Sequence, residues 1–195
     1  MAEVVHGQLV EEQEAKRDPE QEERRRRALA QIRHYPDPAL RLVARQVEDF
    51  DDGLRQLAER MTGLMIDAGG IGLAATQVGV VRRLFVCRLG EDEELHAFVN
   101  PLVTVRGGER VVDDEGCLSL RGVQVPVERA AAVTVEARDV RGAEVVHELE
   151  GLDARVVQHE LDHLDGVLIL DRTTQEARRQ ALARLRPRPT LVARG

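Results

Sequence analysis

Aromatic residues and cysteines are scarce in this sequence. Its 195 residues include no tryptophan, one tyrosine and three phenylalanines, so a folded core has to be built mostly from aliphatic side chains. The two cysteines, Cys87 and Cys117, do not make a disulfide framework, and each needs its own explanation. Hydrophobic residues still make up 43% of the chain, which is enough for one compact domain with tails.

Long apolar segments are absent as well. No stretch has the length of a transmembrane helix, and the charged N-terminus is unlike a signal peptide. The sequence therefore predicts a cytoplasmic protein without a membrane partner. Its formal net charge of −7 argues against general nucleic-acid binding, DNA included.

Charge patterning divides the chain into three parts. Residues 1–30 are polar, with a Glu-rich stretch before a run of arginines, so we expect a flexible extension outside the core. Residues 31–171 have the hydrophobic patterning of a compact domain. Residues 172–195 contain seven arginines and a single acid, Glu176, and predict a basic helix and tail in which Pro187 stops the helix.

The spacing of apolar residues predicts an α+β fold. One helix is expected from Asp51 or Asp52 to Ala68, between an aspartate cap and a glycine pair, and another over residues 152–164. A helix, several antiparallel strands and two further helices follow one another, unlike the regular alternation that builds a parallel sheet. The expected strands are 83–88, 97–105, 133–138 and 144–148.

The string His159-Glu160-Leu161-Asp162-His163 is the strongest chemical signal. Residues four apart share one face of a helix, so the two histidines can reach one metal ion, and Glu160 stands where a general base belongs. The other four histidines have no such context and are interpreted as ordinary surface residues. Because the string alone is only moderately specific, a metal site requires a third ligand.

Cys117 is the best candidate for that ligand. Downstream of His163 there are acids but no further histidine, and Asp165 would point away from the metal face. Cys117 lies next to a glycine in an acidic stretch, which is unusual for a core residue, whereas Cys87 fits a strand as a small buried hydrophobe. Three protein ligands and a fourth position for water are typical of a catalytic metal site.

Residues 69–79 form a segment rich in glycine and alanine. Side chains this small allow the backbone to approach another chain closely, for example an extended substrate. Gln77 adds an amide that can donate a hydrogen bond to a developing negative charge. Taken alone, the segment is equally well interpreted as a glycine-rich turn after a helix.

Three strings together resemble the signature motifs of the peptide deformylases, in the same order: "GIGLAATQ" (70–77), "EGCLS" (115–119) and "QHELDH" (158–163). The resemblance implies an α+β fold in which antiparallel strands surround a central helix that carries the HExxH metal motif. It also implies an activity, which is removal of the formyl group from N-formylmethionyl nascent peptides.

The resemblance further implies roles for single residues. Cys117, His159 and His163 would hold one ferrous ion, for which Ni²⁺, Co²⁺ or Zn²⁺ can substitute. Glu160 would be the general base toward a water that the metal makes acidic. The negative oxygen that forms would be met by the Gln77 amide and the backbone N–H of Leu118. Substrate would contact the Gly72 backbone and the apolar side chains of Ile71, Leu152 and Val156.

Two residues near Cys117 complete these expectations. By resemblance, Glu115 pairs with Arg129 and orients the loop that carries the cysteine, and the alternative interpretation is an ordinary surface acid. Arg121 stands where many peptide deformylases have proline, so side-chain preference beyond the first substrate residue is left open.

Two other classes of function are considered beside deformylation. A zinc metallopeptidase built on the HExxH string would leave Cys117 and Gln77 without a role. An inactive ribosome-associated binding protein would not need all the catalytic positions to be filled. The arginines of residues 172–195 suggest contact with ribosomal RNA, and a solubilising helix end is an equally good interpretation.

Overall fold

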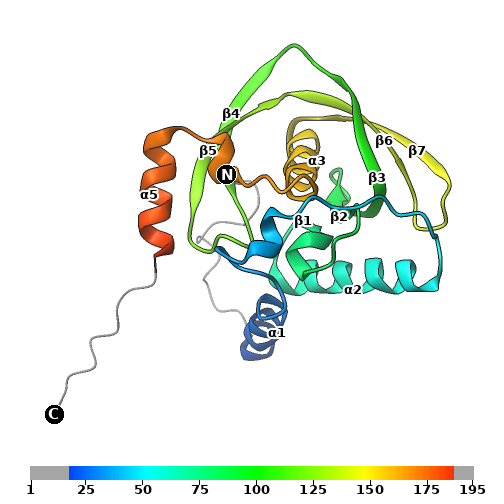
Figure 1. The fold of residues 1–195 in the computed structure, drawn as a ribbon, viewed down its shortest axis with the longest axis horizontal. Helices are drawn as coiled ribbons and strands as arrows, with labels where there is room; N and C mark the ends of the chain where they lie inside the picture. Colours follow the sequence, from blue (N-terminus) through cyan, green and yellow to red (C-terminus); the bar gives the residue numbers. More distant parts are fainter. Residues whose placement is uncertain (1–17, 187–195) are drawn as a thin grey trace.

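The computed structural model describes residues 18–186, which form helices around antiparallel strands (Figure 1). The helices are α1 (Pro19–Leu29), α2 (Asp52–Ala68), α3 (Gly151–Leu164), α4 (Ile169–Arg172) and α5 (Gln175–Leu185), with short 3-10 helices η2 (Pro38–Arg41) and η3 (Ala75–Val78). The strands are β1 (Gly72–Ala74), β2 (Leu84–Leu89), β3 (Glu94–Arg106), β4 (Arg110–Gly116), β5 (Gln124–Ala130), β6 (Ala132–Arg138) and β7 (Glu144–Glu150). None of the helices in this part of the chain is long and apolar enough to span a membrane.

The strands form two antiparallel sheets. Five of them pair in the order β1-β2-β3-β6-β7, and β4 pairs with β5 as a separate two-stranded sheet. Helix α3 contacts β1, β2, β6 and β7 of the first sheet and β5 of the second. Figure 1 shows α3 inside the arch that these strands form, with α2 running beneath. The predicted α+β class is confirmed, and the helix that carries the HExxH string packs against both sheets.

Helix α2 begins and ends at the residues that the sequence predicted. The Asp51 side chain accepts a hydrogen bond from the Leu54 N–H at 2.9 Å, which satisfies a backbone donor that the helix leaves unpaired. The helix ends where Gly69 adopts a φ of 74°, a left-handed conformation that favours glycine. Its apolar face is buried, with Met61 and Met65 fully enclosed.

Three strands were not predicted, namely β1, β4 and β5. In β4 the alternation of polar and apolar residues is broken by the acids Asp113 and Asp114, so the segment does not look like a strand. Its pairing comes from β5, where Val125 and Val127 are buried and Gln124 and Glu128 are exposed. The β4–β5 pair positions Cys117, because β4 ends at the residue before it.

Residues 19–29 correct the expectation that the N-terminal extension lies entirely outside the core. They form α1, which packs against α2, and Ala28 and Leu29 are buried at its end. These two buried residues attach an otherwise exposed helix to the domain. The sequence did not reveal them because the composition of residues 1–30 is dominated by charged residues. The remainder of the predicted extension, residues 1–17, lies outside the described residues.

At the other end, α5 begins after Thr174, whose side chain accepts a hydrogen bond from the Ala177 N–H at 3.2 Å. Ala181 is buried, and the helix packs against β5, so this basic helix is part of the folded domain. The helix ends at Leu185, as the sequence predicts from Pro187. The tail over residues 187–195 lies outside the part of the chain that the structure describes.

Candidate active site

Two different elements bring the predicted metal ligands together. His159 and His163 lie one turn apart on α3, and Cys117 follows the end of β4. One ligand atom from each of the three side chains falls within a group whose members are at most 4.8 Å apart. Within this group, Cys117 Sγ and His163 Nε2 lie 3.2 Å apart.

This cluster fits a single transition-metal ion. Thiolate and imidazole ligands bind zinc at about 2.3 Å and 2.0 Å, so ligand atoms around one ion lie a few ångströms apart. Cys117 and His163 are buried, and His159 is 9% exposed, so the donors have few water molecules to lose. Burial lowers the pKa of His163 well below its usual value, which favours the neutral imidazole that binds metals. Among the described residues this is the one group of three such side chains close enough to hold an ion.

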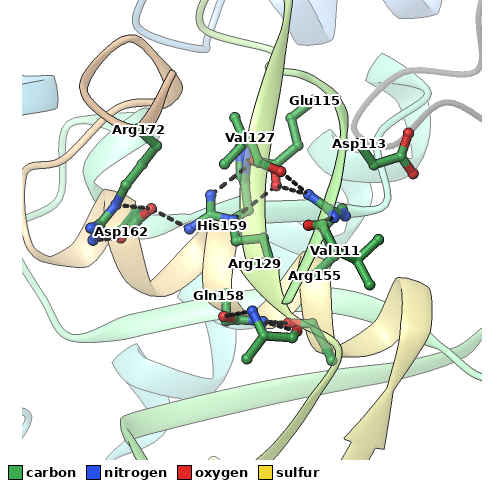
Figure 2. A network of polar contacts seen from close by, with 12 residues as sticks. Val111, Asp113, Glu115, Val127, Arg129, Arg155, Gln158, His159, Asp162 and Arg172 are labelled. Carbon is green, nitrogen blue, oxygen red and sulfur yellow. Dashed lines mark hydrogen bonds and ion pairs between the residues drawn. The ribbon is translucent and has the colours of Figure 1, made fainter. Parts of the chain in front are cut away.

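Glu115 orients His159, one of the three predicted metal ligands. Its Oε2 lies 3.0 Å from His159 Nδ1, which leaves Nε2 of the ring for a metal. Both carboxylate oxygens also accept hydrogen bonds from Arg129 at 2.9 Å, and Arg155 donates a further one at 2.8 Å. Figure 2 shows these contacts around the carboxylate, which is 1% exposed and therefore held in one orientation.

The pKa values of the two buried glutamates move in opposite directions. Burial alone would raise the pKa of Glu115, but hydrogen bonds from Arg129 and His159 lower it well below its usual value. Burial raises the pKa of Glu160 to about 7. Within residues 18–186, Oε2 of Glu160 is buried and has no hydrogen-bond partner. One carboxylate is thus fixed as an anion, and the other is poised to exchange a proton near neutral pH.

Gln77 reaches the cysteine from η3. Its Nε2 lies 3.6 Å from Cys117 Sγ and 3.1 Å from Ser119 Oγ. Its Oε1 accepts a hydrogen bond from the Ala74 N–H at 2.7 Å, so the amide can only present its NH₂ group toward the ligand cluster. The backbone N–H of Leu118 follows the cysteine directly in the chain. Both predicted donors of the oxyanion site therefore lie beside Cys117.

A small cavity of about 20 Å³ opens onto these groups. It is lined by Gln77, Cys117, Leu118, His159 and Glu160 together with Ile71, Gly72 and Val156, which were predicted to contact substrate. Leu152, the fourth predicted contact, is partly buried one turn earlier on α3 and does not line this cavity.

Sequence reasoning missed Arg155 and Asp162. Arg155 lines the cavity and ties Glu115 to the backbone oxygen of Val127 at 2.9 Å. Asp162 lies inside the HExxH string and contacts Arg129 on the side away from Glu115. A signal for Arg155 was present, because it precedes His159 by four residues and therefore shares its helix face.

Comparisons with known proteins agree on one family. The family model of polypeptide deformylases matches residues 29–179. A peptide deformylase of Rhizobium meliloti is 47% identical over 139 residues, which cover 70% of this chain and 80% of the relative. A peptide deformylase of Chromobacterium violaceum is 44% identical over 162 residues, which cover 83% of this chain and 96% of that protein.

Solved structures give the same result. The crystal structure of peptide deformylase from Thermotoga maritima matches with a TM-score of 0.71 and 44% identity, over 73% of this chain and 96% of that one. The peptide deformylase of Ehrlichia chaffeensis in complex with actinonin matches with a TM-score of 0.76 and 32% identity, over 79% of this chain and 94% of that one. The chain therefore belongs to the polypeptide deformylase family, hydrolases that remove the formyl group from N-terminal formylmethionine.

Proposed function

We propose that this chain deformylates nascent peptides in the cytoplasm with Glu160 as the general base and with Cys117, His159 and His163 as the ligands of one Fe²⁺ ion. The observation that carries this proposal is the convergence of the three ligand atoms beside a buried carboxylate that has no partner among residues 18–186. When bound, the ion supplies Lewis acidity, which makes water nucleophilic near neutral pH.

Glu160 moves the proton in this scheme. Its Oε2 accepts a proton from the attacking water and later returns it to the amine nitrogen that leaves as formate is released. A pKa near 7 suits both steps, because the carboxyl can take up and give back a proton at little cost.

Gln77 and Leu118 stabilise the oxygen that becomes negative. The Nε2 of Gln77 and the backbone N–H of Leu118 are held beside Cys117, and donors fixed before the reaction need not reorganise during it. Loss of one such donor typically raises the barrier by about 3–4 kcal/mol.

The peptide part of the substrate fits the free edge of β1. Within residues 18–186 this strand pairs with β2 alone, so its other edge can accept an extended peptide by strand addition, starting at Gly72. The methionine side chain would then lie against Ile71 and Val156 in the cavity, with Leu152 behind them.

Gly72→Ala tests whether catalysis depends on the close contact between Gly72 of β1 and the proposed base, Glu160. A Cβ on Gly72 would lie 2.2 Å from Oε1 of Glu160 and 2.7 Å from its Cδ, so the carboxylate would have to move. We expect a loss of formate release of about 10²-fold, the size typical of a 1 Å misplacement of a reacting group. Metal content should stay the same because no ligand is touched. Gly108→Ala is the control, since a Cβ there meets nothing within 4 Å. Equal rates for the two variants would remove the proposed role of Gly72.

One assay separates this function from its alternatives. Formate release from formyl-Met-Ala is measured beside hydrolysis of the unformylated peptide. Cleavage of the unformylated peptide would favour a metallopeptidase, and absence of turnover of either peptide by metal-loaded protein would favour a binding protein.

We also propose that the basic C-terminus contacts ribosomal RNA. Arg178, Arg179, Arg184 and Arg186 are exposed on or just after α5. Deletion of residues 186–195 should weaken co-sedimentation with ribosomes at low salt, because each lost phosphate contact reduces binding in a salt-dependent way. Dipeptide turnover should be unaffected. Equal co-sedimentation of the full and shortened chains would contradict a contact between RNA and the deleted arginines, Arg186, Arg188 and Arg194.

A further inference from the structure

A second cavity, of about 390 Å³, lies against another face of α3. It shares no lining residue with the catalytic cavity. Its walls come from β3, β4, β5 and α3, with Arg83 just before β2, Asp165 just after α3 and Arg172 at the end of α4. Five arginines line it: Arg83, Arg106, Arg110, Arg129 and Arg172.

Carboxylates only partly neutralise these arginines. Arg83 pairs with Asp165 at 2.7 Å and Arg110 with Glu128 at 3.1 Å. The third carboxylate, Asp162, is shared, because Arg172 contacts both of its oxygens while Arg129 contacts one of them from the other side (Figure 2). Arg129 is also held by Glu115 behind the cavity wall, so four carboxylates pair with these five guanidinium groups. Among residues 18–186, Arg106 is the one arginine of the lining without a carboxylate partner.

Several of these arginines have donors to spare. The Arg106 side chain is exposed and has no hydrogen bond or ion pair to residues 18–186. Arg110 uses only Nε on Glu128 and is 46% exposed, and Arg172 is 48% exposed. A guanidinium carries five N–H donors in a fork that matches the oxygens of phosphate or sulfate.

We propose that this cavity binds a small oxyanion of the phosphate type through Arg106, Arg110 and Arg172. Arg106 has no carboxylate partner among residues 18–186, and Arg110 and Arg172 keep N–H donors that their carboxylates do not use. A tetrahedral anion offers oxygens to all three guanidinium groups, whereas a carboxylate side chain of a peptide offers only two oxygens. The volume accommodates a tetrahedral anion with several water molecules.

The site also connects to the metal ligands through side-chain contacts. Arg172 holds Asp162, Asp162 holds Arg129, and Arg129 holds Glu115, which in turn lies 3.0 Å from His159 Nδ1 (Figure 2). Arg172 is the residue of this series that lies furthest from His159. An anion bound to Arg172 would therefore contact the same series of side chains that orients His159.

The test is calorimetric titration of the full-length, metal-loaded protein with inorganic phosphate at constant ionic strength set by chloride. We expect saturable binding of one anion per chain. Arg106→Ala should weaken it about tenfold, the loss expected for one charge-assisted hydrogen bond. This variant breaks no ion pair within residues 18–186, so its thermal unfolding midpoint should not change. Arg110→Ala should weaken binding to a similar extent.

Arg138→Ala is the matched control for Arg110→Ala. Arg138 is 47% exposed, pairs with Glu144 at 3.5 Å and does not line the cavity. It should bind phosphate like the parent chain. Absence of saturable binding would overturn the proposal, and so would an Arg106→Ala variant that binds like the parent, because the anion would then occupy another place such as the metal centre.

Discussion

Glu160→Ala is expected to retain its metal ion and to lose nearly all formate release. The carboxylate is not one of the three grouped ligands, so metal content should equal that of the parent chain. Removal of a general base typically costs about 10²- to 10⁴-fold in rate. Glu115 is the other carboxylate in the lining of this cavity, and both of its oxygens are bonded to Arg129, so it is not free to replace Glu160.

Glu160→Gln is the companion variant, because it keeps the shape of the side chain and removes only its basicity. Metal content and formate release are measured on the same preparations of both variants. If both variants lose formate release, the defect lies in proton transfer. If only Glu160→Ala loses it, the defect lies in side-chain packing. A rate for either variant within about tenfold of the parent would contradict the assignment of Glu160 as the base.

The sequence was most informative where spacing along one helix determines the geometry. His159, Glu160 and His163 needed only the periodicity of a helix, and α3 places them as expected. The limits of α2 also followed from local signals, an aspartate cap and a glycine in a left-handed conformation. Such features depend on residues within a few positions of one another.

The features that were missed depend on contacts between distant segments. Strand β4 is stabilised by its pairing with β5, and its own residues Asp113 and Asp114 argue against a strand. Arg155 belongs to the site because β4 and β5 bring Glu115 and the Val127 carbonyl to it. The second cavity, which five arginines line, likewise combines residues of β3, β4, β5 and α3. No local sequence pattern predicts it. Pairing of this kind is decided by tertiary packing rather than by local propensity.

Cys117→Ser is expected to bind metal weakly and to be inactive, and this result bears directly on the metal centre. The thiol of Cys117 is grouped with two imidazoles, and a serine hydroxyl is a much poorer ligand because it stays protonated. Cys87→Ser is the control. Cys87 is fully buried in β2, and burial raises the pKa of its thiol well above the usual value, so it stays neutral and does not serve as a ligand. Its variant should retain metal and activity close to those of the parent.

The identity of the ion is tested by reconstitution of metal-free protein with Fe²⁺, Ni²⁺, Co²⁺ or Zn²⁺ in the absence of oxygen. Ligand types alone do not select iron, since affinity for Fe²⁺ is the lowest of these in the usual order. Zinc prefers four ligands, which leaves little room for substrate beside the three side chains and water, so the zinc form should be much slower. The iron form should lose activity in air as the ion or the Cys117 sulfur is oxidised, and nickel should prevent this loss. A zinc form as fast as the iron form would contradict the proposed preference for iron. An active Cys117→Ser variant would contradict the assignment of Cys117 as a metal ligand.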